Sequence, residues 1–159
     1  MRISPVQLNL YLFTKVQVTP AEAPAFSSDI SPRPINWDQV VFGAKIDFGW
    51  AEQDEKDRRA FAVRLFLTID NEQGTPSPYL VELGVMGFFT LLGDIPNEDR
   101  ENIAKVNGAS LLYGVLREML FGLTARFPAG PAILPSMNFL DLKTSSAAEM
   151  TDASSASSK

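Results

Sequence analysis

Carboxylates, lysines and tyrosines are the reactive side chains that this sequence offers for chemistry. It contains 19 Asp and Glu residues and 14 Lys and Arg residues, but no histidine and no cysteine. Ser-His-Asp and Cys-His catalytic arrangements, disulfides, and metal sites built on imidazole or thiolate are therefore excluded. The acidic residues cluster at 52–57 and 70–72, in stretches expected to be turns, where charge is usually solvated. We expect a non-enzymatic protein with no catalytic residue, no metal and no cofactor.

Charge and hydropathy exclude two classes of partner. The net charge is −5 and the basic residues are scattered apart from the pair Arg58-Arg59, so we expect no nucleic-acid partner. The most apolar run, residues 83–92, is about half as long as a membrane span, and residues 1–5 do not resemble a secretory signal. We therefore expect no membrane insertion and a cytoplasmic location.

Period-two alternation predicts four strands. Between residues 6 and 18 the even positions are almost all apolar, which predicts a strand with one buried face. Residues 19–39 contain four prolines and are expected to form a long crossover loop. Further alternation predicts strands at 40–50, 61–69 and 79–89, and the short loops between them favour an antiparallel meander.

A helical pattern follows the strands. Asn97 before a run of acids predicts a helix N-cap, and the pair Asn107-Gly108 is expected to break that first helix. Residues 109–127 then predict a long helix that Pro128 ends. Its predicted apolar stripe is Leu112, Val115, Leu116, Met119, Leu123 and Phe127.

These elements predict an α+β domain over residues 1–143: a four-stranded antiparallel sheet with a crossover after the first strand, covered on one face by the long helix. From residue 144 to 159 the chain is mostly Ser, Ala and Thr. That composition buries too little apolar surface to offset the entropy of ordering, so we expect a disordered tail.

The face of the sheet opposite the helix is also predicted to be apolar. The residues that alternate with the expected core are Tyr11, Phe13, Val41, Phe66, Leu80, Met86 and Phe88. A sheet that is apolar on both faces with only one face covered implies a partner, most simply a second copy of the chain. The alternative is that a bulge shifts the assignment and places some of these residues in the core.

Three segments of the sequence together carry a family resemblance. They are residues 79–83 with Gly87-Phe88-Phe89, residues 107–118 with Arg117-Glu118, and the stretch Leu134-Pro135-Ser136-Met137-Asn138-Phe139. In combination they resemble the SecB family of protein-export chaperones. About 60 residues match well, in family order and at family spacing, and the amino-terminal half matches in pattern. The resemblance implies a homotetramer, built as a dimer of dimers, with long grooves that hold unfolded polypeptide.

The resemblance also indicates where clients would bind. Because the family uses the crossover and the final segment as groove walls, the candidates are Phe26, Trp37, Phe42, Phe139, Leu140 and Leu142. A holdase has to bind many non-native chains without reading a sequence, so it needs apolar surface and adaptable side chains rather than reactive groups. Trp37 has an equally good alternative as a plug between loop and sheet, and for Phe139 packing is the favoured alternative.

Two glycines in the long helix point to assembly. Gly114 and Gly122 fall near one line with Ser110, Glu118 and Ala125, and each glycine costs about 1 kcal/mol relative to alanine in a helix. Family helices meet at the dimer–dimer interface, so close approach of a second copy could offset that cost. The alternative is tight packing on the chain's own sheet. The candidate interface residues are Tyr11, Phe13, Phe66, Gly114, Glu118 and Gly122.

Partner docking is where the sequence departs from the family. Acidic residues on the outer sheet face of SecB dock the translocase motor SecA, and here Glu82, with Leu80 beside it, matches that site. The acidic position after the lysine of the first strand is Val16. The resemblance therefore implies an ATP-independent holdase that keeps preproteins competent for Sec export, or alternatively a dedicated chaperone for one client, such as an antitoxin.

Overall fold

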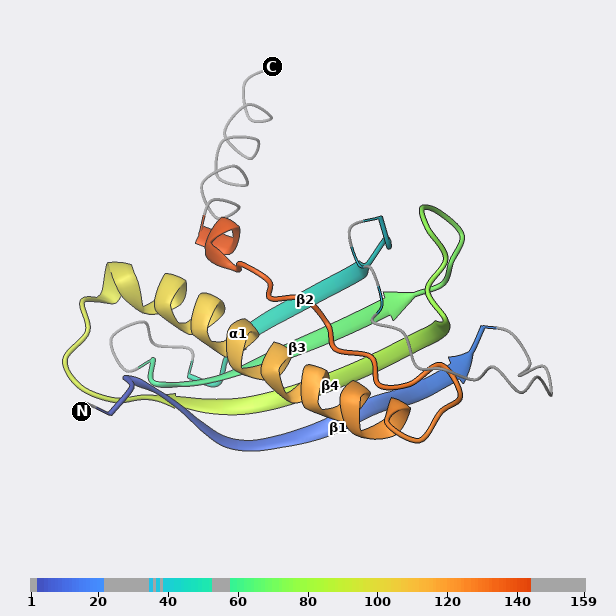
Figure 1. Cartoon of the computed structure of the whole chain (residues 1–159). Coiled ribbons are helices and arrows are strands. Elements are labelled where there is room, and N and C mark those ends of the chain that lie inside the picture. Colours follow the sequence, from blue (N-terminus) through green and yellow to red (C-terminus); the bar gives the residue numbers. More distant parts are fainter. Residues whose placement is uncertain (1–2, 22–34, 36, 38, 53–57, 144–159) are drawn as a thin grey trace, which may run out of the picture.

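Alternating apolar residues form a four-stranded antiparallel sheet, and one long helix crosses one of its faces (Figure 1). The structure, a computed structural model, describes residues 3–21, 35, 37, 39–52 and 58–143. Its elements are β1 (Val6–Pro20), β2 (Gly43–Trp50), β3 (Ala60–Ile69), β4 (Tyr79–Leu91), α1 (Asn97–Thr124) and the 3-10 helix η1 (Leu140–Lys143). The predicted α+β class is confirmed.

The strand order β1-β4-β3-β2 places the first two strands at opposite edges of the sheet. β2, β3 and β4 form the predicted antiparallel meander, and β1 pairs antiparallel with β4. The chain therefore crosses from one edge to the other between β1 and β2, as the prolines predicted. β2 begins at Gly43, later than predicted, because Val40 forms only an isolated bridge with Gly74.

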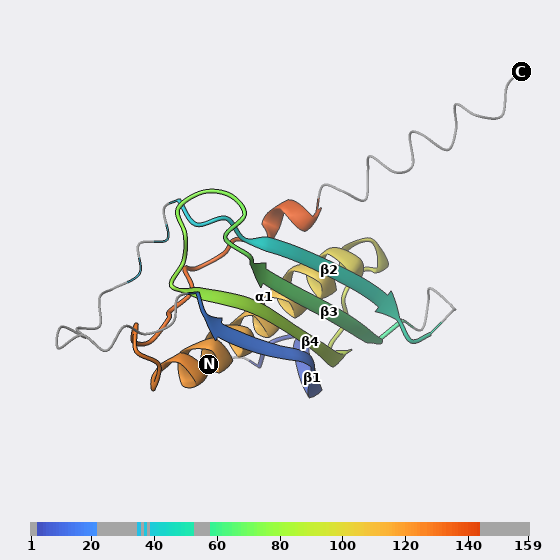
Figure 2. The same ribbon diagram turned by 90° about the vertical axis from the view of Figure 1, so that its right-hand side faces the viewer.

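The core lies between α1 and the face of the sheet that it covers, called here the inner face. α1 packs on β1, β3 and β4. The side chains of β3 and β4 at odd-numbered positions form the floor of this core, and each is at most 2% exposed: Phe61, Val63, Leu65, Leu67, Ile69, Tyr79, Val81, Leu83, Val85, Phe89 and Leu91. The opposite face, the outer face, is toward the viewer in Figure 2.

The alternate side chains of β1 change from one face of the sheet to the other at two points along the strand. Its pairing with β4 shifts register between Leu8 and Leu10 and again between Phe13 and Lys15. Each shift inserts one residue, and because side chains alternate with a period of two, one extra residue moves those that follow to the other face. The simple even-and-odd assignment for β1 therefore fails between the two bulges.

Tyr11 and Phe13 lie in the stretch that the bulges reverse. They pair with Gly87 and Val85, which share the odd-numbered face of β4 with the core residues Leu83 and Phe89, so both point to the inner face. The prediction that they face away from the helix is wrong, and the bulge alternative is the one that holds. Phe66 does lie on the outer face, as predicted, because it alternates with the buried positions of β3.

α1 runs without a break through the Asn107-Gly108 pair, so the predicted interruption is wrong. The side-chain amide of Asn107 donates to the carbonyl of Ile103 within the helix, at 2.8 Å. Gly108 is buried, and a Cβ built on it would lie 2.8 Å from a methyl carbon of Val63. The missing side chain lets the helix lie close on β3, so tertiary packing stabilises the residue that local propensity disfavours.

The end of α1 fixes the segment that follows it. The helix ends at Thr124, whose hydroxyl accepts the N–H of Ala132 at 2.8 Å. The hydroxyl of Tyr79, from the floor of the core, donates to the carbonyl of Gly130. These bonds turn residues 128–139 back along α1 toward η1 (Figure 1).

Candidate binding surfaces

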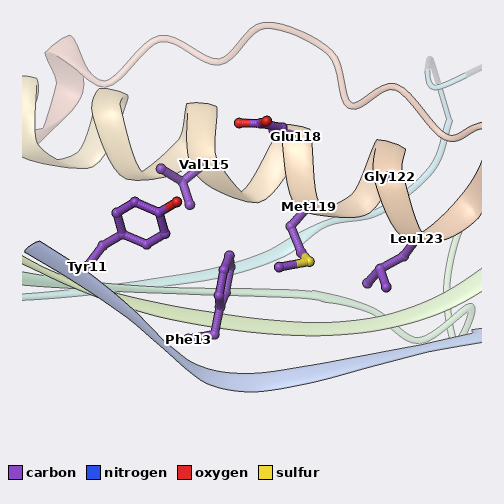
Figure 3. A pocket seen from close by; sticks show the side chains of 7 residues that line it. All are labelled: Tyr11, Phe13, Val115, Glu118, Met119, Gly122 and Leu123. Atoms are coloured by element: carbon purple, nitrogen blue, oxygen red, sulfur yellow. The ribbon is translucent and has the colours of Figure 1, made fainter.

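A groove lies between β1 and α1 on the inner side of the sheet. Its volume is about 290 Å³. The lining residues are Tyr11 and Phe13 from β1, and Val115, Glu118, Met119, Gly122 and Leu123 from α1 (Figure 3). The two aromatic rings meet edge to face, with their centroids 5.8 Å apart. Because β1 is an edge strand, this groove, called here the seam groove, opens along the border of the sheet.

The seam groove brings together four of the six residues predicted for assembly. Tyr11, Phe13, Glu118 and Gly122 line it, although the first two were expected on the other face. Phe66 lies away from it on the outer face of β3. The two bulges of β1 are therefore what places the aromatic residues next to the helix.

Gly114 and Gly122 lie on the solvent side of α1. A Cβ built on either one would meet no atom of the described strands within 4 Å, so the alternative that they pack tightly on the chain's own sheet is wrong. That role belongs to Gly108. Leu111 and Phe121, spaced at helical intervals near the two glycines, are 42% and 45% exposed. An exposed stripe of small and large apolar residues thus runs along the helix beside the seam groove.

Two of the three predicted client residues of the crossover, Trp37 and Phe42, lie just before β2, at the other edge of the sheet. The rings of Trp37 and Phe42 are 5.5 Å apart, and both side chains are half-buried against the core. Phe42 precedes β2 and shares its inner-face parity with Ile46, Phe48 and Trp50. Trp37, Phe42, Ile46, Phe48 and Trp50 are called here the aromatic ledge. Phe26 lies outside the described residues.

Phe48 and Trp50 were not predicted as binding residues. Their rings are 5.2 Å apart, and Phe48 is 5.6 Å from Phe61 in the core. The ammonium of Lys105 lies 5.5 Å from the centre of the Phe48 ring. The side chains of Phe48 and Trp50 are only half-buried, because β2 is at the edge of the sheet and α1 packs on the other three strands. The sequence feature that could have identified them is the pair of aromatic residues at alternate positions of the strand that follows the crossover.

The carboxyl-terminal candidates lie beside α1. The ring of Phe139 contacts Tyr113 edge to face with centroids 5.6 Å apart, and the Tyr113 hydroxyl donates to the carbonyl of Pro135 at 2.7 Å. Leu140 is 52% exposed, whereas Leu142 is half-buried. Phe139 thus has a packing role, and Leu140 is the member of this group that solvent reaches most.

The predicted motor-docking residues lie on the outer face. Leu80 is 37% exposed, and Glu82 is half-buried. The carboxylate of Glu82 is 3.3 Å from the ammonium of Lys15. Leu80 and Glu82 both border a hollow of about 460 Å³ at the end of the sheet. The ion pair places a cation directly beside the acid that was predicted for motor docking.

The acidic clusters are parts of turns where they are described. The carboxylate of Glu52 accepts the N–H of Ala60 at 3.1 Å, and that of Asp70 accepts the N–H of Glu72 at 3.0 Å. Within the described ranges, no group of three or more metal-ligating side chains is placed to hold an ion. No described helix has the length and hydropathy to cross a bilayer.

Comparisons with known proteins identify similar structures rather than similar sequences. No family model matches the chain, and no curated protein matches it. A protein of unknown function from Streptococcus agalactiae is 12% identical, with a TM-score of 0.53 over 83% of this chain and 97% of its own. This similarity shows a shared fold.

A second solved structure is a SecB-like chaperone of Mycobacterium tuberculosis, determined in complex with a peptide from an antitoxin. It is 21% identical to this chain, and the match covers 84% of this chain and 91% of the other, with a TM-score of 0.48.

Proposed function

We propose that this protein is an ATP-independent holdase chaperone of the SecB type, which binds unfolded polypeptides in the cytoplasm. The observation that carries the proposal is the aromatic ledge, where four aromatic rings lie half-exposed along an edge strand. Large rings offer apolar contact area with little side-chain entropy to lose, and they do not select one sequence. The motif resemblance of the sequence supports the same reading.

The backbone of β2 supplies the second component of binding. Among the described residues β2 pairs with β3 alone, so the N–H and C=O groups along its other edge are available to an extended segment. An incoming strand would gain main-chain hydrogen bonds that are independent of its sequence, while its alternate side chains rest on the ledge. Binding of this kind needs no covalent step and no nucleotide.

Assembly into a dimer of dimers is part of the proposal. The stripe around Gly114 and Gly122 combines exposed small and apolar residues with the charged Glu118, and it borders the seam groove, which Glu118 and Gly122 line. A Cβ built on either glycine would meet no described atom within 4 Å. Small residues at helical spacing allow two helices to approach closely, and a symmetric pair would bury the exposed side chains of Leu111 and Phe121. We assign this stripe and the seam groove to contacts between copies of the chain.

The identity of the client separates two forms of the function. A role in Sec export needs docking of SecA on the outer face, where Glu82 is paired with Lys15. Val16, at the second acidic position of the family, is apolar and pairs with Leu83 of the inner face, so it adds nothing to a docking site on the outer face. This observation favours a dedicated chaperone, with one client such as an antitoxin, over a general export factor. Calorimetric titration with SecA distinguishes the two: the export role requires binding, and the dedicated role requires none.

Two adjacent positions on β2 give a direct test of client binding. Ala44 lies on the inner face and Lys45 on the outer face, and both are exposed. A photoreactive amino acid at position 44 should crosslink to a protein that is kept unfolded by reduction and alkylation, and the same residue at position 45 should not. Equal crosslinking at the two positions, or crosslinking at neither, would contradict binding on the ledge.

A further inference from the structure

The outer face of the sheet carries a compact apolar patch that neither the proposed client surface nor the proposed assembly contacts use. Leu10 pairs with Phe88, and Leu12 pairs with Met86, so these four side chains form a two-by-two block on β1 and β4. Phe66 of β3 extends this block. It pairs with Gly84 of β4, and its ring fills the space beside that glycine, since a Cβ built on Gly84 would lie 2.9 Å from the ring. These five residues are called here the outer patch, and they share the face seen in Figure 2.

The bulges of β1 create the outer patch. Without the first register shift, Leu10 and Leu12 would continue the inner face that Val6 and Leu8 occupy. Instead they are 54% and 48% exposed, on the side of the sheet that α1 does not cover. Exposure of paired large aliphatic residues is disfavoured unless another surface covers them, so the placement calls for an occupant.

The area of the outer patch limits the size of that occupant. Phe88 is 37% exposed, and Met86 and Phe66 are half-buried. Taking roughly 150–250 Å² for a large side chain, the patch exposes on the order of 300–400 Å². A stable interface between two folded proteins buries about 800 Å² on each side, so the patch provides about half of that area. It fits a short peptide segment.

The charges around the outer patch select the chemistry of the segment. Arg64 is paired with Met86, and Lys45 is paired with Phe66, so two cations border the patch on the side toward β2. Asp47 of β2 is opposite Arg64 and offsets one of these two positive charges. On the β1 side of the patch, Lys15 forms an ion pair with Glu82. The strand positions of the outer face therefore carry an excess of one positive charge, which favours an acidic ligand.

A second copy of the chain is a poorer occupant of the outer patch. Two outer faces packed together would bring the same excess positive charge against itself, and they would remove five charged side chains from water to bury a small apolar block. A narrow segment can cover the apolar residues and leave those charges solvated. We propose that the outer patch docks a short apolar peptide segment, flanked by acidic residues, that belongs to a partner protein.

A pair of synthetic peptides tests the proposal. Both are twelve residues long and place Leu and Phe at alternate central positions, but one has two Glu at each end and the other has two Lys. Fluorescence anisotropy should show at least tenfold tighter binding of the Glu peptide to the wild-type protein. Equal affinity for the two peptides, or tighter binding of the Lys peptide, would overturn the proposal.

Variants locate the binding site of the Glu peptide. Leu12→Asp is expected to weaken binding of the Glu peptide at least tenfold. Leu10→Asp takes its place if Leu12→Asp does not fold. Ile133→Asp is the matched control, since that side chain is 56% exposed in the segment that follows α1 and is not part of the outer patch. Arg64→Glu should reverse the preference toward the Lys peptide. An unchanged affinity in Leu12→Asp and in Arg64→Glu would exclude the outer patch.

Two further readouts separate this proposal from the others. Leu140→Asp alters an exposed residue that was predicted to bind clients, and it should leave binding of the Glu peptide unchanged. Loss of binding in this variant would place the peptide beside Leu140 and overturn the proposal. Sedimentation should give the same mass for the wild-type protein and for Leu12→Asp. A smaller mass for the variant would make the outer patch a contact between copies, which also contradicts a partner segment.

Discussion

Gly108 of α1 rests directly against Val63 of β3, at a point where any side chain on the helix would have to displace the strand. A Cβ there would come 2.8 Å from one methyl carbon of Val63 and 3.3 Å from the ring of Phe61. This contact sets the depth at which the helix lies on the sheet, and with it the distance between the walls of the seam groove further along α1.

Gly108→Ala should therefore destabilise the protein although alanine favours the helix. Overpacking of a close contact costs about 1–3 kcal/mol, which exceeds the roughly 1 kcal/mol that alanine gains over glycine in a helix. Asn107→Ala, next to it and exposed, is the control and should change stability by about 0.5 kcal/mol or less. Urea unfolding followed by circular dichroism measures both. A Gly108→Ala protein more stable than the wild type would show that the helix can move off β3 at no cost.

The same residue shows where sequence-based prediction of this fold ends. β3 and β4 could be assigned because every odd-numbered position of the two strands except Gly87 is apolar, and the crossover after β1 followed from the four prolines of residues 19–39. Gly108 was expected to break the helix because local propensity does not report the strand beneath it. The bulges of β1 could not be located, since both sets of alternate positions contain apolar residues between Leu10 and Phe13.

The candidate surfaces were partly predictable for the same reasons. The glycine stripe was recognised from its spacing, and its exposure agrees with that reading, because spacing on a helix determines the face. The aromatic ledge was predicted only at Trp37 and Phe42. Phe48 and Trp50 look like core residues in the sequence, and only the edge position of β2 leaves them half-exposed.

Gly122→Leu should weaken association between copies of the chain. A Cβ at this position meets no described atom within 4 Å, so folding should be little affected, whereas a helix packed against Gly122 would be pushed away. Sedimentation velocity at micromolar concentration should show the wild type as a tetramer and the variant as a smaller species. Glu98→Ala, in the exposed first turn of α1, is the control and should keep the tetramer.

A wild-type protein that sediments as a monomer would contradict the proposed assembly. A tetramer that is unchanged in both Gly122→Leu and Gly114→Leu would place the contact between copies elsewhere.

Alkaline pH should destabilise the protein partly through Tyr79. Burial raises the pKa of its hydroxyl above the usual 10.0. Above about pH 10 the unfolded chain loses this proton while the folded chain retains it, so the unfolded state is favoured as pH rises toward the folded-state pKa. One such group lowers the free energy of unfolding by up to about 1.4 kcal/mol per pH unit.

Tyr79→Phe isolates that contribution. The variant should be less stable than wild type near neutral pH by about 1 kcal/mol, because it loses the hydrogen bond to Gly130, and the difference should shrink above pH 10. Urea unfolding across pH 7–11 measures it. Parallel stability curves for the two proteins would show that the Tyr79 hydroxyl titrates normally in the folded state.

Leu140→Asp should reduce capture of unfolded protein while leaving the fold intact. The side chain is 52% exposed in η1, so a charge there costs little stability but disfavours an apolar client. Light scattering by an aggregating protein, with and without the variant, measures the loss. Ile133→Asp, at 56% exposure on the preceding segment, should protect as well as the wild type. Equal loss in both variants would indicate a general effect of charge.

The most direct measurement is the affinity of the wild-type protein for one polypeptide in two states: reduced and alkylated, so that it stays unfolded, and native with its disulfides intact. A holdase with the aromatic ledge as its binding surface should bind the unfolded form with a Kd in the micromolar range or tighter, without nucleotide, and should not bind the native form. Failure to bind any unfolded polypeptide, or equal affinity for both states, would contradict the proposed function.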